Sequence, residues 1–268
     1  MPDIFYLLSK WWKQVVLFVL LCCLSVAAIL FLQPRQYLSQ ATALRANPAF
    51  TDKARLFNNN IEGLYSSLGS PDELDMIVGT AQLDTIYLSQ VDSFSLVSHY
   101  QLKGDAVIAR MKAAYKLHKH TDVIKSGYGE LKVRVWDKDK NLAAALANAI
   151  MQKLQLIHQG LINENNISTL ASLQNAQQQL LTVADSQVNL PTWKQAALNK
   201  QLEQYEELIG EYRLIQATRP LALLVVENAR PATRADKPRI VAVMIATLLL
   251  SLVFALLTVL YLEKTRKP

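Results

Sequence analysis

Two long segments without a charged residue limit what this chain can fold into. Val15–Leu32 contains 18 residues and Ile240–Leu262 contains 23. As helices that rise about 1.5 Å per residue they would measure about 27 and 35 Å, which is enough to cross a hydrocarbon core about 30 Å thick. The sequence therefore predicts two transmembrane helices, at residues 15–32 and 240–262.

The first apolar segment could instead be a cleaved signal peptide, because Lys10 and Lys13 precede it and Ser25–Ala28 is a loose cleavage site. However, its apolar core exceeds the roughly 7–15 residues of a signal peptide. The stretch Ile4–Lys13 before it is also long and apolar, and it has the character of an interfacial segment with two tryptophans at the membrane surface. We therefore interpret the first segment as an uncleaved anchor.

Both chain termini are predicted to lie on one side of the membrane, because the two spans separate residues 1–14 and 263–268 from the long segment 33–239. Bases flank the terminal sides of both spans, which favours cytoplasmic termini under the positive-inside rule. Four bases just before the second span oppose this orientation, but long domains cross membranes largely regardless of their charge. We expect a two-pass protein of a bacterial inner membrane, with residues 33–239 in the periplasm.

The segment between the spans is close to neutral, with 23 Lys and Arg residues against 20 Asp and Glu residues. Its excess positive charge lies between Arg230 and Arg239, where four bases accompany Asp236. A chain without an extended basic surface is not expected to bind nucleic acid. Two interpretations of the basic cluster stay open: anchoring to lipid headgroups, or contact with a phosphorylated lipid carrier or an anionic glycan.

The residue types that support catalysis or metal binding do not form a recognisable arrangement. Cys22 and Cys23 lie within the first apolar segment, so the rest of the chain has neither a disulfide framework nor a thiolate metal site. No G-x-x-x-x-G-K-[ST] sequence is present to bind a nucleotide phosphate. His118 and His120 could supply two metal ligands, but no further ligand has suitable spacing, and we interpret them as a solvated helix end. The sequence predicts a protein that is not an enzyme and has no cofactor or metal.

Three segments between the spans have strand character. Tyr37–Leu44 directly follows the first span, Glu130–Trp136 alternates apolar and basic residues with the period of a strand, and Leu221–Val226 is a short apolar run. Helical patterns cover Asp52–Met76, Asp84–Tyr100 and Asp105–Lys119.

Two long helices are predicted at about residues 140–188 and 192–217. Asp137 and Asp139 precede the first and would cap its N-terminus. The second has the 4-3-4-3 apolar spacing of a coiled-coil seam. This seam, a candidate surface for helix packing or oligomerisation, comprises Leu198, Leu202, Tyr205, Ile209 and Tyr212. We expect an α+β domain, with a small mixed sheet near the membrane plus a long helical arm, between two transmembrane helices.

The segment Asn228–Arg239, here called the connector, links the last predicted strand to the second span. Its two prolines fix φ and lack an N–H group, so the connector is expected to be extended and stiff. It is our candidate for the part of the chain that fixes how the domain sits on the bilayer. The candidate residues are Arg230, Pro231, Arg234, Lys237, Pro238 and Arg239.

Several short motifs follow one another along the chain. "DIFYLLSKWWKQ" (Asp3–Gln14) precedes the first span, and the Tyr37 strand follows it. "VRVWDKDKNLAAALANAI" (Val133–Ile150) combines a strand, an aspartate and a helix with an Ala…Leu-Ala-Asn signature. The two long helices and the proline-containing "ENARPATRADKPR" (Glu227–Arg239) complete the order. Together these features resemble the polysaccharide co-polymerase family, also called chain-length determinant proteins, over the whole chain.

Two departures from the family pattern are visible. The usual Asp-Pro after the strand is Asp137-Lys138 here. The second span lacks the glycines often seen in the family, which leaves only Ala242/Ala246 and Ser251/Ala255 as small-residue spacings for helix packing. Tight association of the two spans is therefore not expected from the sequence.

The resemblance implies an inner-membrane homo-oligomer, a ring or bell, that works with a polysaccharide polymerase or export proteins on a lipid-linked glycan. The expected function is regulation of the chain length of a surface polysaccharide, such as the O-antigen of lipopolysaccharide, a capsule or an exopolysaccharide. One alternative is a structural inner-membrane component of a capsule or exopolysaccharide export machine. Another is a periplasmic sensor whose output lies in a partner.

Overall fold

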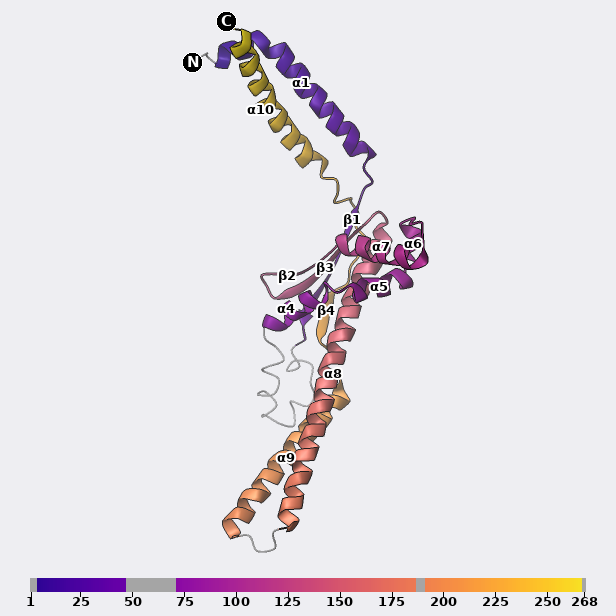
Figure 1. The fold of residues 1–268 in the computed structure, drawn as a ribbon, viewed down its shortest axis with the longest axis vertical. Coiled ribbons are helices and arrows are strands. Elements are labelled where there is room, and N and C mark those ends of the chain that lie inside the picture. Colours follow the sequence, from indigo (N-terminus) through magenta and orange to yellow (C-terminus); the bar gives the residue numbers. More distant parts are fainter. Residues whose placement is uncertain (1–3, 47–70, 187–190, 267–268) are drawn as a thin grey trace. The chain divides into compact units, whose positions relative to one another are not determined.

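The computed structural model describes residues 4–46, 71–186 and 191–266 (Figure 1). The chain divides into two compact units. The membrane-helix unit comprises Met1–Leu38, Trp136–Ala143 and Pro231–Pro268, and the sheet unit comprises Ser39–Val135 and Ala144–Arg230.

Two long apolar helices make up most of the membrane-helix unit: α1 (Ile4–Leu32) and α10 (Ile240–Arg266). Each is long and apolar enough to cross a membrane, over Trp11–Leu32 and Ile240–Leu262 respectively. Only 11% of each of these windows is buried, whereas a core helix of a water-soluble protein is mostly buried. The two helices therefore fit a two-pass membrane protein.

α1 and α10 pack against each other, contrary to the expectation from the missing glycines. Val15 of α1 is buried with Ala255 and Val259 of α10, and Trp11 and Val19 lie against this cluster. The small-residue spacing Ser251/Ala255 is buried, with 6% and 2% of the two residues exposed, whereas Ala242 and Ala246 are exposed. Small side chains let helix backbones approach closely without glycine.

A four-stranded sheet has the order β2-β3-β1-β4. Its strands are β1 (Tyr37–Arg45), β2 (Thr121–Lys125), β3 (Glu130–Asp137) and β4 (Leu223–Glu227). β2 and β3 pair antiparallel as a hairpin, and β1 and β4 also pair antiparallel. The α+β fold class is thus confirmed, with antiparallel pairing at both outer edges of the sheet.

Strand β2 was not expected from the sequence. Its turn to β3 is closed by a hydrogen bond from Ser126 N–H to Glu130 O, at 2.8 Å, and uses Gly129 at a φ of 76°, a value that glycine adopts without strain. β4 begins at Leu223 rather than at Leu221, because Arg45, the last residue of β1, pairs with Leu223.

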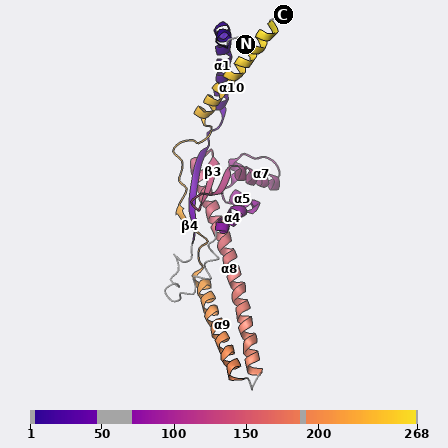
Figure 2. The same ribbon diagram turned by 90° about the vertical axis from the view of Figure 1, so that its left-hand side faces the viewer.

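One face of the sheet is covered and the other is more open. On β3, Leu131, Val133 and Val135 are fully buried, while the alternate residues are half-buried, as the period of two requires. The first turns of α8 (Lys140–Ser186) bury an apolar stripe rich in alanine. Figure 2 shows α8 together with α4, α5 and α7 on one side of the strands.

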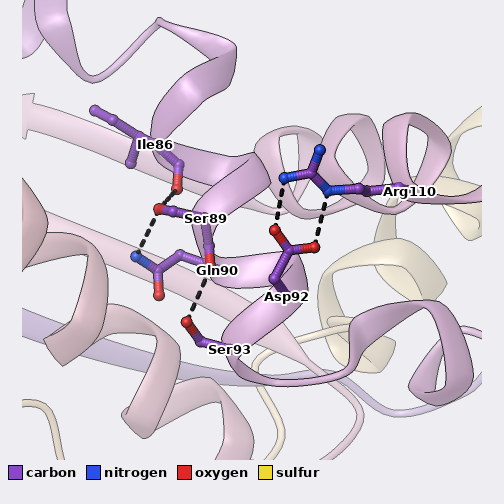
Figure 3. Close-up of polar contacts among 6 residues, drawn as sticks. All are labelled: Ile86, Ser89, Gln90, Asp92, Ser93 and Arg110. Carbon is purple, nitrogen blue, oxygen red and sulfur yellow. Dashed lines mark hydrogen bonds and ion pairs between the residues drawn. The ribbon is translucent and has the colours of Figure 1, made fainter. Parts of the chain in front are cut away.

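The short helices of the sheet unit are α4 (Pro71–Thr80), α5 (Asp84–Ser93), α6 (Leu96–His99) and α7 (Ala106–Lys119). Figure 3 shows how Asp92 of α5 accepts two hydrogen bonds from the Arg110 guanidinium of α7, at 2.8 and 2.6 Å. In the same view the hydroxyl groups of Ser89 and Ser93 donate hydrogen bonds to backbone carbonyl oxygens of α5. The part of the predicted Asp52–Met76 helix before Pro71 lies outside the described residues.

The arm of the sheet unit consists of α8 and α9 (Thr192–Thr218), which lie side by side in both views (Figures 1 and 2). α8 has 47 residues and continues through Gly160, where its sequence pattern is weak. α9 has 27 residues. At about 1.5 Å per residue they measure about 70 and 40 Å. The last two residues of the helix expected at 140–188 lie outside the described residues.

Candidate functional site

The membrane-proximal end of the connector is paired with the residue that precedes β1. Gln36 and Lys237 form an isolated antiparallel bridge. Gln36 N–H donates to Lys237 O at 3.0 Å, and Gln36 O accepts from Asp236 N–H at 2.9 Å. These bonds join the exit of α1 to the entry of α10 within the membrane-helix unit.

Trp136, at the end of β3, holds the same part of the connector by its side chain. Its indole N–H donates to Asp236 Oδ2 at 2.8 Å. The ammonium group of Lys237 lies 4.2 Å from the centre of the Trp136 ring, within the range of a cation–π interaction. We call Gln36, Trp136, Asp236 and Lys237 the connector clamp.

Electrostatics favour the charged form of the carboxylate in the clamp. The hydrogen bond from Trp136 lowers the pKa of Asp236, and Arg239 adds to the effect. An Arg239 guanidinium nitrogen lies 3.3 Å from Asp236 Oδ1. The carboxylate therefore stays ionised and accepts bonds from both neighbours at neutral pH.

The sheet-proximal end of the connector is held in the sheet unit by Asn148 of α8. Its side-chain amide donates to Ala229 O at 3.1 Å and accepts from Ala229 N–H at 2.7 Å. Ala229 is only 6% exposed, so these bonds satisfy backbone groups that water reaches poorly. Ser39 of β1 donates its hydroxyl to Arg230 O at 3.0 Å. Asn148 belongs to the Ala…Leu-Ala-Asn signature noted in the sequence.

The two aspartates before α8 bond to backbone N–H groups. Asp139 Oδ1 accepts from Asn141 N–H at 2.8 Å, and Asp137 Oδ1 accepts from Asp139 N–H at 2.9 Å. Asp139 therefore occupies the N-cap position of α8, in the geometry that satisfies an end group of the helix. Asp137 is 3% exposed and closes the turn from β3.

The candidate connector residues predicted from the sequence differ in their exposure and in their contacts. Arg230, Pro231, Arg234 and Lys237 are exposed, and Pro238 is half-buried. The Arg239 side chain is 74% exposed although it contacts Asp236. Four residues that fasten the connector were missed in the sequence: Gln36, Ser39, Trp136 and Asn148.

The seam residues of α9 face inward along the arm. Leu198, Leu202, Tyr205 and Tyr212 are half-buried and Ile209 is buried. Tyr205 lines a groove between α8 and α9 together with Leu180, Val183 and Leu208. Within this chain the seam therefore lies against α8.

Two histidines have structural contacts. His118 stacks on Tyr87 with ring centroids 4.3 Å apart and lies 3.1 Å from Gln82 Oε1. It lies in the last turn of α7 and is half-buried. His158 is 7% exposed and lies 3.0 Å from Thr80 Oγ1, and its burial lowers its pKa. Among the described residues, no three His, Cys, Asp or Glu side chains are grouped as metal ligands.

Comparisons with known proteins found similar chains among the solved structures. No protein-family model and no curated protein matches the chain. The chain is similar to a solved full-length bacterial polysaccharide co-polymerase, with 13% identity, 99% of this chain and 98% of that chain covered, and a TM-score of 0.43. It is also similar to a fragment of WzzB, a polysaccharide co-polymerase from Salmonella Typhimurium, with 14% identity, 76% and 100% coverage, and a TM-score of 0.37.

Proposed function

We propose that this protein is an oligomeric inner-membrane scaffold that regulates the chain length of a lipid-linked surface polysaccharide together with a polymerase. The observation that carries the proposal is the connector with its fastenings. The Ala…Leu-Ala-Asn signature and the proline-containing segment, which carry part of the family resemblance, are the segments that bond to each other through Asn148 and Ala229. A scaffold without chemistry of its own needs such fixed positions rather than a reactive group.

Assembly into a homo-oligomer is part of the proposal. Leu44 of β1 and Leu224 of β4 are direct cross-strand neighbours, and both are exposed, by 39% and 45%. Val226, two residues further along this edge strand, is 60% exposed. Exposed apolar groups on an edge strand favour contact with another protein surface. We propose that a second copy of the chain covers them, in a ring or bell.

The proposed orientation places both termini in the cytoplasm and the sheet and arm in the periplasm. Its support is the distribution of bases around the two apolar helices. Reporter fusions test the orientation. A reporter that works only in the cytoplasm should be active when it is fused to either terminus. A reporter that works only in the periplasm should be active when it is inserted near Pro191.

The test of function is a gel profile of surface and cell-associated polysaccharide, with and without the protein. We expect the polymer to remain at the surface but to lose its preferred length when the protein is absent. Polymer that is retained inside the cell would instead support the export component. An unchanged profile would refute both functions and favour a sensor.

A further inference from the structure

The part of the membrane-helix unit outside its two apolar helices is rich in bases. In residues 33–38, 136–143 and 231–239, six bases stand against three carboxylates. These segments belong to one compact unit although they lie far apart in the sequence. Their charges therefore contribute to the electrostatic potential of the same part of the molecule.

All three carboxylates bond within the fold. Asp137 accepts from Asp139 N–H, and Asp139 accepts from Asn141 N–H at the start of α8. Asp236 accepts from the Trp136 indole and contacts Arg239. The negative charges thus bond to donors of the protein itself.

Most of the bases, by contrast, are exposed to the surroundings. Arg35, Lys138, Lys140 and Arg234 are all exposed. The Arg239 side chain remains 74% exposed beside Asp236, and one contact leaves most of the five donors of a guanidinium available. These five residues are here called the foot surface.

The foot surface adjoins the apolar helices in the sequence. Arg239 is followed directly by Ile240, the first residue of α10, and Arg35 follows Leu32, the last residue of α1, by three positions. When these helices cross a bilayer, residues just beyond their ends lie at the depth of the lipid headgroups. The Trp136–Asp236 bond ties Lys138 and Lys140 to the same region.

We propose that the foot surface binds the phosphate groups of anionic phospholipids. Bases near a membrane surface each favour anionic lipid by about fivefold in affinity, and guanidinium groups form paired bonds with phosphate oxygens. The connector clamp holds the surface in place by fixing Trp136 against the connector. The proposal does not depend on the role in polysaccharide synthesis.

The experiment uses the full-length protein, purified in mixed micelles with equal amounts of phosphatidylglycerol and phosphatidylcholine. Native mass spectrometry counts each lipid bound per chain. We expect the wild type to retain an excess of phosphatidylglycerol. The variant with Lys138, Lys140, Arg234 and Arg239 all replaced by Gln should lose at least tenfold of that preference. Circular dichroism checks that it is folded.

A matched control removes four exposed lysines of the sheet unit and should keep the wild-type preference; its changes are K103Q, K112Q, K119Q and K200Q. A second variant, K10Q/K13Q, measures the contribution of the opposite end of α1. Should the fourfold Gln variant prove unfolded, K138Q/K140Q alone should still lose part of the preference.

Three results would overturn the proposal. The first is an unchanged preference in a folded foot-surface variant. The second is an equal loss in the sheet-unit control or a complete loss in K10Q/K13Q. The third is displacement of phosphatidylglycerol at one molecule per chain by a polyprenyl phosphate, which would assign the surface to a lipid carrier instead of membrane phospholipid.

Discussion

Replacement of Asn148 by Ala tests the sheet-proximal fastening of the connector. The substitution removes the two bonds to Ala229, at 2.7 and 3.1 Å, and leaves a backbone N–H and C=O without partners at a residue that is 6% exposed. Each unsatisfied buried group costs about 1–3 kcal/mol, and the higher helix propensity of alanine offsets part of this. We expect the free energy of unfolding to fall by about 2–5 kcal/mol.

The assay is urea unfolding of the full chain in detergent micelles, followed by far-ultraviolet circular dichroism. The control is Asn175→Ala, because Asn175 is an exposed asparagine on the same helix. The control should change stability by less than about 0.5 kcal/mol. Equal midpoints and slopes for the two variants would refute the view that Asn148 fastens the connector.

Four further predictions concern the clamp, the cap and the seam. Trp136→Phe removes the indole donor to Asp236 and should lower the free energy of unfolding by about 1.5–3 kcal/mol in the same assay. A variant that unfolds at the wild-type urea midpoint would show that this hydrogen bond does not stabilise the connector. Because the folded state lowers the pKa of Asp236, its contribution is complete above the unfolded pKa of about 3.9 and is lost as pH falls through the folded value. The difference between wild type and Asp236→Asn should therefore shrink from pH 7 to pH 3; a constant difference would contradict the assignment. Asp139→Ala should cost about 0.5–2 kcal/mol through loss of the N-cap, whereas Asp139→Asn should be close to neutral in urea unfolding. Leu202→Asp should disturb the arm or the oligomer, and light scattering and circular dichroism that both match the wild type would show that the seam is not an interface.

Elements with a strong local pattern could be predicted from the sequence. The alternation in β3 and the apolar periodicity of α8 and α9 follow from residues that are neighbours along the chain. β2 has only five residues, and its pattern Thr-Asp-Val-Ile-Lys buries only Val123. Such a short segment does not show the alternation that identifies a strand.

The connector clamp and the bonds between Asn148 and Ala229 could not be predicted in the same way, because the bonded residues are distant in the sequence. Trp136 and Asp236 are 100 residues apart, and Asn148 and Ala229 are 81 residues apart. Asn148 carried a weak local signal, since an amide on the alanine-rich stripe of a helix needs a polar partner when it is buried. The identity of that partner depends on the tertiary fold.

The packing of α1 on α10 shows that two membrane helices can approach closely without glycine in the second one. The sequence lacks glycine in the second span, but Ala255 lies buried in the contact with α1, and Ser251, one turn before it, is also buried. A serine hydroxyl can bond within its own helix, as Ser251 does with Leu248 O at 3.0 Å. A small volume, rather than glycine itself, is what close packing requires.

The modal length of the surface polysaccharide in cells that carry Pro231→Ala/Pro238→Ala is the most direct test of the account. The two prolines restrict the connector between the sheet and α10, so the variant should insert and accumulate normally while the gel profile moves to a different or broader length distribution. An unchanged profile at equal protein amounts would contradict the proposal that the connector positions the domain on the bilayer for its role in regulating chain length.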